Sequence, residues 1–203
     1  MRFQSRPESY IAPYVIDTGT ISARSADTLG LETAWVNGPF SLQAEFLHSF
    51  VSPTEGSTLN FGGYYLAASW FLTGESRPYD RATASFTRPS PRQNFSWKKR
   101  TWGAFEVACR WSYTNLSDHD VQGGGLRILM GGLNWYLQPH IRWYLNAGWG
   151  RVTGTSQTGD VGILQVRLAV FMQEPGDPVD VDTGDRPRAR DRVFPGRFLP
   201  RVR

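Results

Sequence analysis

Three arginines hold equivalent positions in three separate segments of the chain. Arg110, Arg142 and Arg167 each stand on the polar side of a segment in which apolar and polar residues alternate. The guanidinium group stays charged at physiological pH, and its planar fork matches the oxygens of phosphate. Rings of such side chains in a narrow pore attract anions and repel cations. We therefore predict that they bind anions in a lumen, together with Arg127 and Arg151, which stand nearer the predicted loops.

Carboxylates on the same side of these segments leave a second interpretation open. Glu32, Glu45 and Glu106 share the polar side with the arginines. Opposite charges on neighbouring strands stabilise a sheet by pairing. The arginines are therefore either anion sites or structural partners of these carboxylates, and the sequence does not choose between the two roles.

The densest basic cluster of the chain consists of Lys98, Lys99 and Arg100. It is flanked by Trp97 and Trp102 and ends a long, proline-containing connection over residues 72–101. If this connection folds into the lumen, the cluster forms a cationic constriction. A solvated basic turn, or one near anionic lipid, explains the same residues. Basic residues among aromatics also occur in single-stranded nucleic-acid sites, but no other feature of the sequence supports such a partner.

No residue set in the sequence points to catalysis, a metal or a cofactor, and we predict that the protein is not an enzyme. Asp118, His119 and Asp120 have types suited to acid–base chemistry, but they fall in a predicted polar loop. The glycines of residues 122–125 lack the Lys-Ser/Thr that completes a phosphate-binding loop. Cys109 is the single cysteine, and the three histidines are far apart without ligand spacing.

The elements that would position these residues are strands, because the dominant pattern has a period of two. Most of the alternating segments have large aromatics near an end and smaller aliphatics beside them on one side, and polar residues on the other. Their lengths fit the roughly ten residues of a tilted membrane strand. The seven segments cover residues 29–35, 40–51, 63–70, 105–113, 129–135, 141–149 and 164–170.

The connections between these segments also suit a barrel. Residues 37–39 and 138–140 are short turns, whereas residues 52–60, 115–124 and 154–160 are predicted as longer polar loops. Bacterial barrels divide short periplasmic turns from longer outer loops in this way. An eighth strand is possible over residues 3–16, although two prolines interrupt it. The connection over residues 72–101 is predicted either to enter the lumen or to contain a further strand pair.

Aromatic residues favour a membrane barrel over a soluble β-sandwich. Most of the eight tryptophans share the apolar side of their segments and lie close to turns, where rings would meet the lipid–water boundary. Mean hydropathy is negative, which a barrel tolerates because every second residue faces water. The first residues show no apolar core of a signal peptide, so we expect a partial chain. We predict a barrel region over residues 1–172 and a disordered tail over residues 173–203.

Several of these segments resemble the phosphate-selective porin O and P family. The most specific match is Ser-Trp-Phe-Leu-Thr-Gly-Glu-Ser-Arg at residues 69–77. Residues 35–43 (Trp-Val-Asn-Gly-Pro-Phe-Ser-Leu-Gln) resemble a hairpin of the family, and residues 132–137 (Gly-Leu-Asn-Trp-Tyr-Leu) resemble another. Residues 103–108 and 163–167 resemble two of its strands. All these motifs occur in the same order along the chain as in the family.

The resemblance implies a trimeric porin of the Gram-negative outer membrane that passes phosphate or other small anions. It implies a transmembrane antiparallel β-barrel of about sixteen strands, of which this chain would hold the C-terminal eight or so. Barrel chains usually end on an aromatic residue. This chain departs from that pattern, since Met172 stands at the corresponding position and a tail follows. Two other functions stay open: a soluble or surface β-domain that binds a ligand, and a non-conducting structural barrel.

Overall fold

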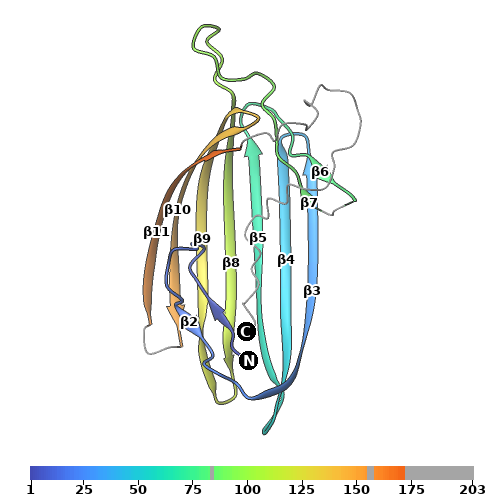
Figure 1. Ribbon diagram of the computed structural model, residues 1–203, viewed down its shortest axis with the longest axis vertical. Helices are drawn as coiled ribbons and strands as arrows, with labels where there is room; N and C mark the ends of the chain where they lie inside the picture. The colour runs from blue at the N-terminus through green and yellow to red at the C-terminus, as the bar shows by residue number, and fades with distance from the viewer. Residues whose placement is uncertain (83–84, 155–157, 172–203) are drawn as a thin grey trace.

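One antiparallel sheet of seven long strands dominates the computed structural model, which describes residues 1–82, 85–154 and 158–171. Figure 1 shows the strands side by side, β11 (Gly159–Val170), β10 (Ile141–Thr153), β9 (Val121–Gln138), β8 (Ala104–Asp118), β5 (Leu59–Phe71), β4 (Phe40–Pro53) and β3 (Ala23–Asn37), in that order. Strands β3 and β11 are the edges of this sheet, which is not closed by the described residues. The predicted all-β, antiparallel fold is confirmed, and each of the seven predicted segments lies in a strand.

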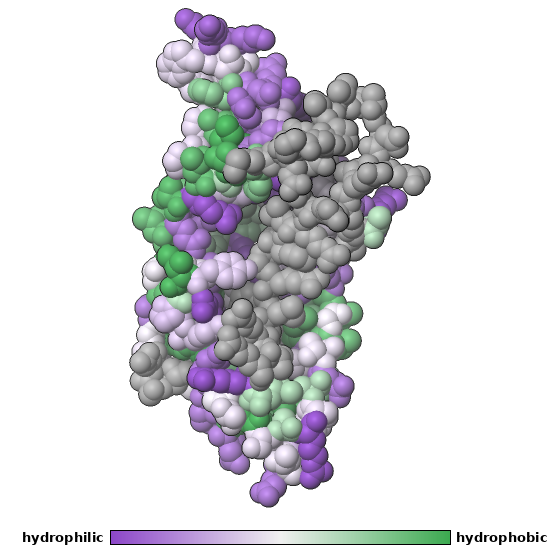
Figure 2. Space-filling model, in the orientation of Figure 1, coloured by the Kyte–Doolittle hydropathy of each residue, from purple (hydrophilic) through white to green (hydrophobic). Residues whose placement is uncertain are grey.

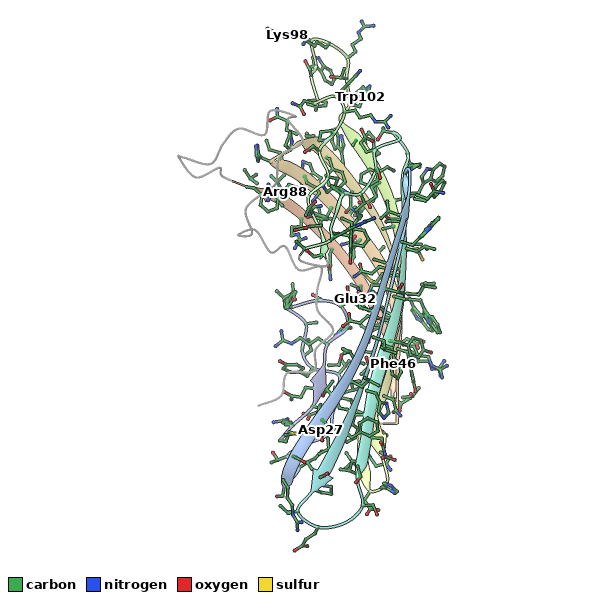
Figure 3. The ribbon with its side chains drawn as sticks, turned by 90° about the vertical axis from the view of Figure 1, so that its right-hand side faces the viewer. Asp27, Glu32, Phe46, Arg88, Lys98 and Trp102 are labelled. Atoms are coloured by element: carbon green, nitrogen blue, oxygen red, sulfur yellow. The ribbon has the colours of Figure 1, made fainter. Side chains whose placement is uncertain are left out.

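The sheet has two different faces, and the alternation in the sequence sets them. On β8, Trp111 and Cys109 are exposed, whereas Ser112 and Glu106, at positions of the other parity, are buried. Figure 3 shows the sheet edge-on, with Phe46 on its convex side and Arg88 on its concave side. We call the convex side, with the exposed apolar residues, the outward face, and the concave side the inward face.

The outward face is an apolar band between two aromatic rows. Trp143 of β10 lies opposite Trp135 of β9 near one end of the sheet, and Trp149 lies opposite Leu129 toward the other end. Trp143 and Trp149 are six residues apart, or ~20 Å along a strand at about 3.4 Å per residue. Barrels carry an apolar band roughly 25 Å tall. Figure 2 shows hydrophilic residues at both ends of the molecule and hydrophobic residues along the left edge, over β10 and β11.

The connection between β8 and β9 is tighter than the predicted loop over residues 115–124. The two strands continue to Asp118 and Val121, and only His119 and Asp120 form the turn. The register shifts between Asn115 and Ser117, which marks an irregularity in the ladder. A Cβ on Gly123 would lie 2.1 Å from the Leu116 carbonyl oxygen. The glycine-rich stretch is therefore part of a strand, and glycine is needed there because the neighbouring backbone approaches so closely.

Residues 1–22 do not form the possible eighth long strand. Two short strands, β1 (Gln4–Ser5) and β2 (Ile16–Asp17), pair in a separate two-stranded sheet. In Figure 1 this segment crosses in front of β8 and β9. Its apolar side chains pack against buried residues of the inward face and form a core cluster. The fully or almost fully buried members are Phe3, Ile16, Ile21, Val51, Leu59, Phe61, Leu116, Leu126, Ile128 and Val152.

The long connection between β5 and β8 contains the further strand pair that was predicted as one option. Strand β6 (Tyr79–Asp80) pairs with β7 (Ser85–Phe86). The connection also reaches the inward face, where Arg77 forms an ion pair with the buried Glu106. The strand pair is therefore present, and the part of the connection around Arg77 lies on the inward face. The predicted boundary at residue 172 and the predicted disordered tail lie outside the described residues.

Candidate anion pathway on the inward face

Tyr144 lies between two of the predicted arginines on the inward face. The Arg142 guanidinium carbon lies 4.1 Å from the centroid of its ring, and that of Arg167 lies 4.2 Å from it. Both guanidinium groups thus lie over the same tyrosine ring. Arg167 is the cross-strand partner of Tyr144, and Arg142 precedes it by two residues on β10. The ladder register thus produces this stack.

The stack holds two positive charges with neutral partners. Arg142 also donates a hydrogen bond from Nη1 to the Tyr136 hydroxyl at 3.1 Å. Among the residues that the structure describes, neither Arg142 nor Arg167 forms a salt bridge with a carboxylate. A tyrosine ring attracts a cation through its quadrupole without cancelling the charge. Among the described residues, no carboxylate therefore pairs directly with either guanidinium group.

A buried carboxylate organises the inward face next to this stack. Glu106 of β8 is fully buried. Its Oε2 accepts hydrogen bonds from Asn134 Nδ2 at 2.9 Å and from the Tyr136 hydroxyl at 2.7 Å. Its Oε1 accepts one from Arg77 of the long connection. A buried carboxylate is stable when it is paired and its remaining lone pairs are satisfied, so Glu106 anchors the connection on the sheet. Arg77, and not Arg110 or Arg142, is its ion-pair partner.

Arg110 lies on the inward face as predicted, but it has a carboxylate partner. Its Nε lies 3.2 Å from Glu8 Oε1, and the two side chains are 19% and 16% exposed. Its guanidinium carbon also lies 3.6 Å from the centroid of the Tyr65 ring. Both roles that the sequence left open thus occur on one face: Arg110 is paired with a carboxylate, whereas Arg142 and Arg167 rest on tyrosine.

Arg127 and Arg151 lie on the outward face, which corrects their expected place in a lumen. They are opposite each other on β9 and β10, in the row next to Leu129 and Trp149. Arg127 lies over the Tyr113 ring at 5.3 Å, and Arg151 Nε lies 3.9 Å from Asp160. Their positions have the parity of the apolar residues, because both are odd-numbered on strands whose odd positions point outward.

The basic cluster Lys98, Lys99 and Arg100 projects away from the sheet, so it does not form the constriction considered above. All three residues are exposed, in a turn closed by the bridge between Ser96 and Thr101. Figure 3 shows Lys98 at the tip of this turn, beyond the ends of the strands. The structure thus shows an exposed basic turn, which fits both a solvated turn and one near anionic lipid. The part of the connection that turns inward carries Arg77 and Arg88 instead.

The sequence reasoning missed three groups of the inward face. Arg77 and Arg88 lie in the long connection, and Arg88 stands 3.8 Å from the centroid of the Phe171 ring at the end of β11. Glu8 lies in the segment that was considered as a strand. Tyr144 shares the parity of Arg142, and that shared parity was the one signal in the sequence that could have found it. The other contacts join residues far apart in the chain and leave no local pattern.

The chemistry available on this face is electrostatic recognition. Among the described residues no group of histidines, cysteines and carboxylates could hold a metal ion, and no helix is long and apolar enough to cross a membrane. Arginines with neutral partners can bind an oxyanion reversibly. The inward face is therefore a candidate path for anions along the sheet.

A family model with the description "Phosphate-selective porin O and P" matches residues 1–171 of the chain. The match covers every strand of the sheet and the inward segment. The chain belongs to the phosphate-selective porin O and P family. This confirms the resemblance that the sequence suggested, and it explains the two-faced strands and the aromatic rows as features of a porin wall.

Two relatives place the chain within this porin family. Porin O of Pseudomonas aeruginosa is 29% identical over 153 residues, which is 68% of this chain and 34% of that protein. An uncharacterized protein of Caulobacter vibrioides is 30% identical over 148 residues, which is 72% of this chain and 29% of that protein. The chain thus spans about a third of the length of these relatives.

Proposed function

We propose that this chain forms part of the wall of a pore in the Gram-negative outer membrane, through which phosphate or other small anions diffuse. The family match and the apolar band between aromatic rows support a membrane wall. Arg142 and Arg167, both over the Tyr144 ring, carry the anion preference. Since neutral rings hold these guanidinium groups, the inward face keeps a positive potential that favours anions in a narrow lumen.

The test is the ion selectivity of the native barrel, purified from outer membranes and placed in planar bilayers. A potassium chloride gradient should give a reversal potential that shows chloride preferred over potassium. Replacing both arginines (Arg142→Gln and Arg167→Gln) should move this potential toward zero, because the inward face loses two charges. Arg127→Gln combined with Arg151→Gln is the matched control, since it removes the same two charges from the outward face. Cation preference in the wild type, or an equal effect of the control, would reject the proposal.

A non-conducting structural barrel is the second candidate, and one observation favours it. Residues 1–22 cover the inward face near one end of the sheet, and their apolar side chains make a tight cluster there. A barrel filled in this way would insert into the bilayer and stay silent. Conductance steps in the same bilayer experiment separate the two candidates. A soluble ligand-binding domain is the third, and a native protein that stays in solution without detergent would support it.

The family also suggests the assembly, and we propose a homotrimer embedded in outer-membrane lipid. Chemical cross-linking of intact outer membranes should give a band at three times the protomer mass. A band only at the protomer mass would reject the trimer and leave the pore proposal untouched.

A further inference from the structure

The sheet holds the Glu8 carboxylate in the way that it would hold a bound anion. Its carboxylate Oε1 accepts hydrogen bonds from Arg110 Nε at 3.2 Å and from Ser112 Oγ at 2.9 Å. Both donors belong to β8, whereas Glu8 belongs to the inward segment of residues 1–22. Gln165 of β11 donates a hydrogen bond from Nε2 to the Glu8 carbonyl oxygen at 3.0 Å. Two strands of the wall thus hold this one residue.

The backbone of Glu8 supports the importance of these contacts. Its φ is 51°, a left-handed conformation that is uncommon for a residue other than glycine. Such a conformation persists only where the surroundings hold it in place. Here the surroundings are the wall donors, and the carboxylate side chain is only 16% exposed. The segment therefore places a carboxylate against the wall, although the backbone of Glu8 adopts an unfavourable conformation there.

The donors on the wall form a set that suits oxyanions generally. A guanidinium group and a hydroxyl group bind the oxygens of a carboxylate or a phosphate alike. The Arg110 guanidinium is further oriented by the Tyr65 ring, 3.6 Å away. We propose that Arg110 and Ser112 form an oxyanion-binding site in the pore wall and that Glu8 is its internal ligand, which competes with permeating anions. This inference rests on the proposed pore function.

The internal carboxylate has a consequence for conduction. An anion must bind well enough to enter the pore and weakly enough to leave it. Arg110 together with Arg142 and Arg167 would offer three strong sites on one wall. Because Glu8 neutralises Arg110, this position binds a passing anion only when Glu8 is displaced. Removing the Glu8 charge should therefore convert a weak site into a strong one.

The experiment measures how inorganic phosphate blocks the chloride current through the native barrel. Glu8→Gln should lower the half-blocking phosphate concentration roughly tenfold, because the competing ligand loses a hydrogen bond to a charged group. Glu32→Gln is the matched control. It removes the same charge from the inward face, where Glu32 accepts a hydrogen bond from Gln43 at 3.1 Å and has no arginine partner among the salt bridges of the described residues. The control should leave the half-blocking concentration unchanged.

A second variant keeps the test decisive if Glu8→Gln alone fails to reach the membrane. Glu8→Gln combined with Arg110→Gln removes the pair as a neutral unit, and it should block like the wild type. If Glu8→Gln leaves the block unchanged in a barrel that still prefers anions, the inference is overturned and the pore proposal stands. Weaker block in the double variant would also overturn it, because Arg110 would then serve anions in the wild type. A wild type that prefers cations refutes the pore proposal itself.

Discussion

An arginine in place of Leu145 tests whether the outward face meets lipid. Leu145 lies on the outward face of β10, between Trp143 and Trp149, and is 45% exposed. It is two residues from Trp143, or about 7 Å along the strand, in a band whose half-length along the strand is ~10 Å. A charge on the lipid side of a barrel costs about 2–4 kcal/mol at the midplane and about 0–1 kcal/mol near the interface. At two thirds of the way to the midplane, Leu145→Arg should lower the free energy of unfolding by about 2 kcal/mol.

The assay is guanidinium unfolding of the native barrel in lipid vesicles, followed by tryptophan fluorescence. Asn146→Arg places the same charge one residue along β10, on the inward face, and should cost much less because water can solvate it there. Leu145→Ala separates the loss of the leucine side chain from the added charge. The lipid-facing assignment would be refuted if Asn146→Arg cost as much as Leu145→Arg. It would also be refuted if Leu145→Arg cost no more than Leu145→Ala.

Three further predictions follow from other contacts. Cys109, the single cysteine, lies exposed on the outward face, so a spin label there should collide with oxygen dissolved in lipid and not with a water-soluble relaxant; the reverse would contradict the orientation of β8. Glu106→Gln should lower the free energy of unfolding by about 3–5 kcal/mol, because it leaves Arg77 without its buried carboxylate; chemical unfolding measures this, and a loss below about 1 kcal/mol would contradict it. Hydrogen bonding to the Arg2 guanidinium lowers the pKa of Asp17 to about 2, below the roughly 3.9 of an unfolded chain. This contact therefore stabilises residues 1–22 fully above pH ~4 and is lost as the pH falls toward 2. Amide protection factors of this segment should show that loss, and Asp17→Asn should remove it.

The seven strands were predictable because one face of each strand requires apolar residues and the other face does not. Between Trp143 and Trp149, every outward position carries an apolar residue, whereas the inward positions carry tyrosine, asparagine and glycine, so the period of two is clear. The hairpin at His119 and Asp120 was missed because strands that extend beyond the apolar band meet water on both faces. There the alternation disappears, and the glycines of residues 122–125 look like a loop although close backbone packing requires one of them.

The same loss of contrast explains the errors in the predicted site. Arg110, Arg142 and Arg167 lie within the clear part of the pattern, and their inward position was predicted from parity. Arg127 and Arg151 lie beside the aromatic row, where a charged residue is tolerated on either face, so residue type alone did not reveal their direction. The partners of the inward arginines were beyond sequence reasoning for a different reason. Glu8 is 102 positions from Arg110 along the chain, and only the folded sheet brings the two together.

The arginines of the inward face fall into two groups: some are paired with a carboxylate, and others are held by an aromatic ring. Arg77 and Arg110 are held by carboxylates, so each pair contributes little net charge. Arg142 and Arg167 are held by Tyr144, whose ring attracts both guanidinium groups without neutralising either one. Carboxylates in that position would fix the side chains equally well, but they would cancel the field that attracts anions. Strong but neutral pairs thus fasten the inserted segments to the wall, whereas the aromatic ring keeps two guanidinium charges on the wall itself, where an anion could use them.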